Sequence, residues 1–252
     1  RSENWSAAAA RRAASIVVGV AVGYAFVRRQ GKLADPLIDL SLFRRPTFSA
    51  SLAVYTLGIL VFFAAFFFIY QYLQLVLDLS PLMAAVWTLP SFGSFIAGSM
   101  LAPALVRRVR PAFIMAPGLV IGAFGFLLLT QVQADAGLLV LVTATVIASL
   151  GMAPLFTLTN DLIIGCAPPE KAGAASGISE TGAELGGALG IAVMGSLGVA
   201  IYRSRLTDRL PDGIPARAVV AARDTLGSAV AVAAELPDRL GTALLAAQAP
   251  PR

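Results

Sequence analysis

The chain has 252 residues, of which 58% are hydrophobic and only 13% are charged. The charged residues are bunched between long apolar runs. This distribution excludes an ordinary soluble domain and predicts an all-α membrane protein. The net charge of +5 would suit nucleic acid, but the cations lie among membrane-scale apolar runs, so we expect them to orient loops and expect no nucleic-acid partner. The chain contains no histidine and a single cysteine, Cys166, and it shows neither a phosphate-binding loop motif nor the spacing of metal ligands. These features argue against an enzyme, so we expect no catalytic residue, metal or cofactor.

Six apolar runs have the length of a membrane span, which needs roughly 20 helical residues. They lie at 9–27, 48–72, 82–106, 112–131, 137–160 and 177–201. The first run is the weakest, because Arg11 and Arg12 leave only residues 13–27 free of charge. A tilted or shallow span whose arginines reach the surface would accommodate it. The pattern predicts a polytopic helix bundle of about six transmembrane helices.

The short connections between these runs differ in their positive charge. Basic residues occur in the connections 28–46, 107–110 and 161–176, and none occurs in 73–81 or 132–136. The basic turn contains Arg107, Arg108 and Arg110. By the positive-inside rule the first three connections are cytoplasmic and the other two external, although arginines near both chain ends argue the other way. We expect a multi-pass membrane protein, with the lipid bilayer as its surroundings.

An aromatic run at 62–72 is too continuous to form one helix face. Most of its rings are expected to pack against lipid or neighbouring helices, with the tyrosines near the interface. Phe66 and Tyr70 are candidates for contact with an organic cation through their π faces. At the end of the fifth run, Asn160 and Asp161 are expected to act as a helix cap or as a gate.

The last apolar run carries two acids, Glu180 and Glu184, spaced four residues apart. On a helix they lie one turn apart on the same face, about 6 Å along the axis. An ionised carboxylate inside a membrane costs about 2.5–3.5 kcal/mol even on permissive scales, so these acids need water, partners or protons. Two close carboxyls also disfavour double ionisation, which suits a carrier that gains and loses protons. Glu184, the deeper acid, is the first candidate for proton coupling.

An alternative places the helix start near Leu185, with both acids solvated at the helix N-terminus. That start leaves only the residues up to Ile201 to span the membrane, which is at the short limit. Glycines at 182, 186 and 190 share a four-residue spacing that favours close approach of another helix.

From Tyr202 onward, charges recur too often for a membrane span, and prolines at 211 and 237 divide two alanine-rich stretches. Residues 203–252 are therefore expected to form an external amphipathic helical hairpin, with a disordered tail as the alternative. The chain begins with Arg1 and ends abruptly after an amphipathic stretch, so we expect an internal piece of a longer protein.

Four stretches together resemble the fourteen-span drug/proton antiporter branch of the major facilitator superfamily, closest to its quaternary ammonium and methyl viologen exporters. They read ADPLIDLSLFRRPTF (34–48), QYLQLVLDLSPLMAAVWTLP (71–90), GSMLAPALVRRVRP (98–111) and GMAPLFTLTNDLIIGCAPPEKAGAASGISETGAELGGALGIAVMGS (151–196). With the tail they cover nearly the whole chain, and the last stretch is the most specific.

The resemblance implies a partial major facilitator fold in the bacterial plasma (inner) membrane, corresponding to the C-terminal half of such a carrier. Residues 1–47 would then hold an extra central span and a cytoplasmic linker. Residues 48–202 would form five spans of the C-terminal six-helix bundle. Residues 203–252 would form the external hairpin before a missing last span. The N-terminal half of the same transporter would be the partner, because half a carrier encloses no midplane site. Some members carry an acid in the span matching 82–106, which this chain lacks, and Arg110 stands where a glycine is common.

The family's use of acids in the matching span implies roles in proton coupling or drug recognition for Glu180 and Glu184. The leading hypothesis is export of lipophilic organic cations in exchange for protons. The first alternative is export of neutral or anionic metabolites on the same scaffold. The second is a truncated, non-transporting membrane protein that assembles with another subunit.

Overall fold

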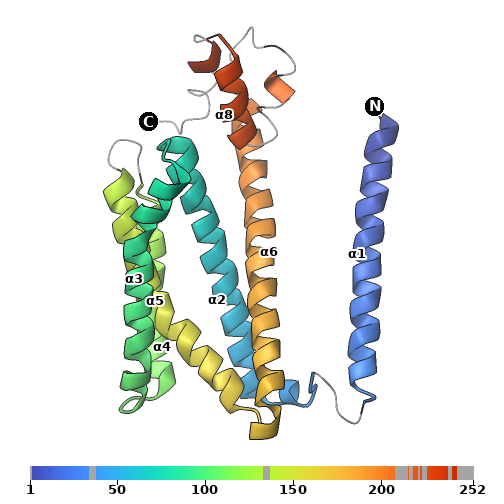
Figure 1. Cartoon of the computed structure of the whole chain (residues 1–252), viewed down its shortest axis with the longest axis vertical. Helices are drawn as coiled ribbons and strands as arrows, with labels where there is room; N and C mark the ends of the chain where they lie inside the picture. Colours follow the sequence, from blue (N-terminus) through green and yellow to red (C-terminus); the bar gives the residue numbers. More distant parts are fainter. Residues whose placement is uncertain are drawn as a thin grey trace. The chain divides into compact units, whose positions relative to one another are not determined.

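The computed structural model describes residues 2–33, 38–132, 137–207, 215, 218–220, 222, 226–237 and 240–242 (Figure 1). Over these residues all regular structure is helical, and no strand occurs. The helices are α1 (Ser2–Gln30), α2 (Pro46–Gln71), α3 (Pro81–Val106), α4 (Pro111–Leu129), α5 (Gly137–Gly165), α6 (Ala172–Thr207) and α8 (Leu226–Glu235). A π-helical turn (Tyr72–Val76) follows α2, and 3₁₀ turns lie at Leu42–Arg44 and Pro169–Lys171.

Proline and serine explain where α3 begins. Pro81 is its first residue, where the missing N–H would have no partner inside the helix. The Ser80 hydroxyl caps the helix by accepting a hydrogen bond from the Met83 N–H at 3.3 Å. Just before this cap, Asp78 has φ 53°, a left-handed conformation that short polar side chains tolerate better than most. The sequence Asp-Leu-Ser-Pro therefore ends one span and starts the next within a few residues.

The described chain forms two compact units. One comprises Arg1–Leu52 with Asn160–Thr181, and the other comprises Ala53–Thr159 with Gly182–Arg252. The first unit has a small apolar interior in which Leu42, Phe48 and Ile163 are almost fully buried. The second unit contains most of the helix packing, including a cluster formed by Met152, Leu155 and Phe156.

Close contact between α4 and α5 depends on residues without large side chains. Gly118, Gly122 and Gly125 of α4 are buried where α5 crosses them. A Cβ atom added at Gly125 would lie 2.6 Å from the Ala148 Cα, and one added at Gly151 would lie 2.5 Å from the Gly118 carbonyl oxygen. The two backbones therefore approach as closely as small-residue interfaces in membranes allow.

Five helical segments are long and apolar enough to cross a membrane: Pro46–Val76, Pro81–Val106, Pro111–Leu129, Gly137–Gly165 and Pro169–Ser204. They correspond to the second through sixth predicted runs, so the all-α polytopic prediction is confirmed. The first predicted run, 9–27, is helical within α1 but is not among the five segments found in the described residues. A span there stays a prediction.

Two boundaries differ from expectation. A helix start near Leu185 is wrong, because α6 begins at Ala172 and contains both Glu180 and Glu184. The depth of the two acids in the membrane stays a prediction. The fifth span does not end at residue 160, because α5 continues to Gly165. In the tail, α6 extends to Thr207 and α8 ends two residues before Pro237, while most of the remaining hairpin prediction lies outside the described residues.

Candidate functional site

Glu180 and Glu184 lie within α6, and both are exposed. The residue before Glu180 behaves differently. Ser179 is buried, and its hydroxyl donates a hydrogen bond to the Asn160 side-chain oxygen of α5 at 2.8 Å. Neighbouring residues on a helix point about 100° apart, so the helix can bury Ser179 against α5 while Glu180 remains exposed.

The opposite side of α6 packs on α2. A Cβ atom added at Gly186 would lie 2.5 Å from the Thr56 carbonyl oxygen, and one added at Gly190 would meet the Leu60 carbonyl group. At 100° per residue these two glycines lie about 200° and 240° from Glu184 around the helix. The predicted glycine packing is therefore present for Gly186 and Gly190. It leaves Glu184 on the face of α6 that points away from α2.

The predicted helix-end role of Asn160 and Asp161 needs correction. Both residues lie inside α5, which continues to Gly165, so they do not cap its end. Asp161 is exposed, whereas Asn160 is half-buried and accepts the hydrogen bond from Ser179. Asn160 therefore joins α5 to α6 beside Glu180, and a gating role for the two residues stays a prediction.

The two aromatic candidates are engaged in helix packing. Phe66 is buried in a cluster with Ile69, Leu73, Ala84 and Leu141. Its ring lies 4.5 Å from that of Phe62, centroid to centroid. Tyr70 is half-buried, and its hydroxyl lies 3.1 Å from the Thr88 hydroxyl of α3. Contact of either ring with a substrate stays a prediction, and for Phe66 it would require the cluster to open.

A line of hydroxyl groups along α3 was missed by the sequence analysis. Thr88, Ser91 and Ser94 are spaced three residues apart, so they share one side of the helix. Thr88 and Ser91 are almost fully buried, and the Ser94 hydroxyl donates to the Val146 carbonyl oxygen of α5 at 3.0 Å. With Tyr70 they provide uncharged polar groups between α2, α3 and α5. The three-residue spacing was the signal that could have identified them.

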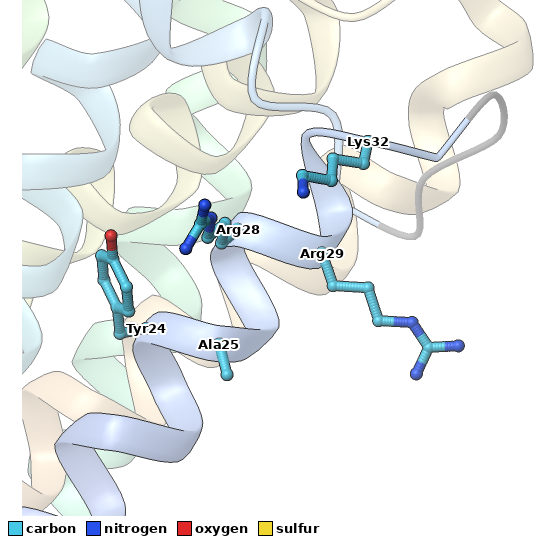
Figure 2. Close-up of a pocket in the computed structure, with 5 residues that line it drawn as sticks. All are labelled: Tyr24, Ala25, Arg28, Arg29 and Lys32. Carbon is cyan, nitrogen blue, oxygen red and sulfur yellow. The ribbon is translucent and has the colours of Figure 1, made fainter.

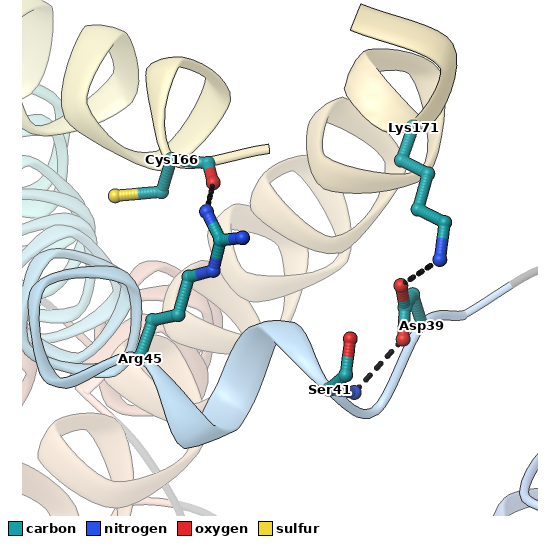
Figure 3. Close-up of polar contacts among 5 residues, drawn as sticks. All are labelled: Asp39, Ser41, Arg45, Cys166 and Lys171. Carbon is teal, nitrogen blue, oxygen red and sulfur yellow. Dashed lines mark hydrogen bonds and ion pairs between the residues drawn. The ribbon is translucent and has the colours of Figure 1, made fainter. Parts of the chain in front are cut away.

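Polar contacts in the first unit join the segment before α2 to the connection between α5 and α6 (Figure 3). The Lys171 ammonium lies 2.5 Å from an Asp39 carboxylate oxygen. The Ser41 backbone N–H donates to the other Asp39 oxygen at 2.9 Å, and Arg45 donates to the Cys166 carbonyl oxygen. Hydrogen bonds from Lys171 and then Ser41 hold the pKa of Asp39 at about 2, below its ordinary value of 3.8. Asp39 is therefore ionised at any physiological pH.

This ion pair gives a pH-dependent prediction. The pKa of Asp39 is lower in the folded chain, so its ionised form stabilises the fold above about pH 3.8, and this contribution is lost as the pH falls toward 2. Because Lys171 is half exposed, we expect Lys171→Met to lower the free energy of unfolding at neutral pH by less than about 1 kcal/mol. Thermal unfolding at several pH values measures the difference in stability between the original protein and the variant. This difference should vanish as the pH approaches 2.

An Asp39→Asn background provides the control for this prediction. Once Asp39 cannot ionise, Lys171→Met should cause little further loss of stability, as a double-mutant cycle requires. An equal loss in both backgrounds would show that Lys171 stabilises the chain through contacts other than the ion pair.

The other predicted residues are distributed as follows. Arg107, Arg108 and Arg110 are exposed in the turn between α3 and α4. Within the described part of the chain, no group of three or more histidine, cysteine or acidic side chains is arranged to hold a metal ion. The strongest candidate site is therefore the exposed acidic face of α6.

Comparison with known proteins identifies a family model that covers most of the chain. The model described as Major Facilitator Superfamily matches residues 4–191. The multidrug efflux pump LfrA of Mycolicibacterium smegmatis is 39% identical over 237 residues, which is 94% of this chain and 46% of the relative. The tetracenomycin C resistance and export protein of Streptomyces glaucescens is 32% identical, over 74% of this chain and 34% of the relative.

The methyl viologen resistance protein SmvA of Salmonella typhimurium is 29% identical over 87% of this chain and 44% of its own length. The chain thus spans about half the length, or less, of these relatives.

Proposed function

This chain belongs to the major facilitator superfamily, and its relatives include one named as a multidrug efflux pump and one named as a resistance and export protein, so we propose that it is the C-terminal portion of a proton-coupled multidrug exporter. It is a multi-pass protein of the bacterial inner membrane. Its proposed substrates are lipophilic organic cations, including quaternary ammonium compounds, and its proposed partner is the N-terminal half of the same transporter.

The observation that carries this proposal is the pair of exposed carboxyl groups on α6. Glu180 and Glu184 lie in a helix long and apolar enough to cross a membrane, and both are exposed. A carboxylate in such a place gains either from binding a proton or from facing a cation. Alternation between these two states would exchange protons for cationic drugs.

Names of relatives bear on the substrate class. Methyl viologen, named in one relative, is an organic cation, which supports the cationic proposal. Tetracenomycin C, named in another, keeps the alternative of neutral or anionic substrates open. The acid-free α3, with its hydroxyl line of Thr88, Ser91 and Ser94, offers hydrogen bonds without charge. That leaves α6 as the proposed source of charge selectivity.

The test uses the complete exporter reconstituted in vesicles loaded with a fluorescent quaternary ammonium dye. We expect efflux to follow an imposed pH gradient, to stop when a protonophore collapses it, and to be inhibited by other lipophilic cations. Efflux that ignores the gradient would contradict proton coupling. Inhibition by anionic or neutral compounds but not by cations would favour the alternative substrate class. A protein that assembles with another membrane subunit and shows no flux would support the non-transporting interpretation.

A further inference from the structure

Within the compact unit formed by Arg1–Leu52 and Asn160–Thr181, α1 carries exposed apolar side chains. Val17, Val20, Val22 and Tyr24 are each more than 60% exposed. Apart from the chain neighbours and the backbone of the same helix, no atom of the described residues lies within 4 Å of a Cβ built at Gly19 or Gly23. Apolar side chains that are this exposed to water contribute no hydrophobic stabilisation, which they gain only when lipid or protein covers them.

Cationic side chains follow this apolar surface at the C-terminal end of α1. An open depression of about 520 Å³ is lined by Tyr24, Ala25, Arg28, Arg29 and Lys32. Figure 2 shows Tyr24, Arg28 and Lys32 on one side of the chain and Arg29 pointing the other way. Tyr24 and Arg28 share one side because residues four apart on a helix lie one above another, and Lys32 lies in the turn that follows α1. None of the five lining residues is acidic.

The chemistry of this side of α1 fits a phosphate diester. A guanidinium donates two parallel hydrogen bonds to phosphate oxygens, an ammonium supplies a compact positive charge, and a tyrosine hydroxyl adds one more donor. The adjoining apolar surface of α1 suits acyl chains. A soluble anion would use the cations but gain nothing from the valines. An anionic lipid uses the cations through its phosphate and the valines through its acyl chains. We therefore favour a lipid over a soluble anion as the source of the phosphate.

We propose that Tyr24, Arg28 and Lys32 form a binding site for the headgroup of an anionic phospholipid, with its acyl chains along the exposed valine surface of α1. Basic residues beside a membrane surface attract anionic lipids, each with a strength of about 1 kcal/mol. A defined binding site differs from this general attraction because it requires two particular cations, Arg28 at the end of α1 and Lys32 in the turn that follows. The site does not depend on the proposed transport activity.

The test measures lipid binding to the complete protein in detergent by native mass spectrometry. Phosphatidylglycerol and phosphatidylcholine with identical acyl chains serve as probes. We expect the protein to prefer phosphatidylglycerol, and the Arg28→Gln/Lys32→Gln variant to bind it about tenfold or more weakly. Tyr24→Phe should cause a smaller loss. All three positions are exposed, and circular dichroism of each variant verifies that helix content is unchanged.

The Arg107→Gln/Arg108→Gln variant is the matched control, because it also removes two positive charges, here from the exposed turn between α3 and α4. It should retain the preference for phosphatidylglycerol. An equal loss in both double variants would mean general electrostatic attraction and would overturn the proposal. So would an absence of lipid preference in the unmodified protein. Displacement of phosphatidylglycerol by inorganic phosphate would assign the cations to a soluble anion, which would also overturn it.

Discussion

Changing Glu184 to glutamine in the complete exporter is expected to reduce gradient-driven dye efflux to the rate of vesicles without protein. Glutamine keeps the size and hydrogen-bonding capacity of the side chain but can neither release a proton nor attract a cation. Because Glu184 is exposed on the side of α6 away from α2, this exchange disturbs no described packing. The loss would therefore be chemical, and the variant should insert and unfold like the original protein.

Two variants define what the Glu184 result means. Glu184→Asp keeps a titratable group and should retain part of the efflux. Glu170→Gln makes the same change at an exposed glutamate in the connection before α6, outside the acidic face, and should leave efflux unchanged. If Glu184→Gln transports normally in a folded, inserted protein, proton coupling does not depend on this residue. In that case Glu180→Gln becomes the deciding variant for the pair.

The Gly151→Ala substitution is expected to lower the free energy of unfolding by about 1–3 kcal/mol, the usual cost of forcing extra atoms into a packed interior. The added methyl group would lie 2.5 Å from the Gly118 carbonyl oxygen and would also meet the Gly122 backbone. Both neighbours are main-chain atoms of α4, so no side chain can rotate away. The helices would have to separate, and contacts along the whole α4–α5 interface would weaken.

A glycine in an open position provides the contrast. Apart from its chain neighbours and the backbone of its own helix, no described atom lies within 4 Å of a Cβ added at Gly93 in α3. There, alanine should stabilise the helix by up to about 1 kcal/mol, because it restricts the unfolded chain more than glycine does. If thermal unfolding shows that Gly93→Ala raises the free energy of unfolding and Gly151→Ala lowers it, the close approach of α4 and α5 is supported. Similar effects at both positions would argue against it.

The membrane fold was accessible from sequence because hydropathy determines span positions almost by itself. Pro81 and Pro111 mark helix starts, and the predicted runs match the observed segments within a few residues at most ends. The exceptions have local causes. Leu162, Ile163 and Ile164 continue α5 as an apolar stretch beyond Asp161. The alanine- and glycine-rich stretch from Ala172 extends α6 upstream of its acids.

The partners of individual side chains were less accessible. Asp39 and Lys171 are 132 positions apart, and nothing in their local sequences indicates that they meet. Phe66 belongs to an aromatic run in which hydropathy cannot distinguish a lipid-facing ring from a packed one. Glu180 and Glu184, by contrast, were identifiable because charge is costly inside an apolar span. Sequence thus identifies unusual residues, while their contacts depend on how distant helices meet.

The conformation of Asp78 changes how membrane topology should be inferred from this chain. An aspartate in a span-connecting segment is easily counted as evidence for the external side, yet this one occupies a backbone geometry that most side chains resist. Asparagine or glycine would satisfy the same bend without any charge. The residue's acidity is then incidental to sidedness, and the assignment of that segment rests on its lack of lysine and arginine.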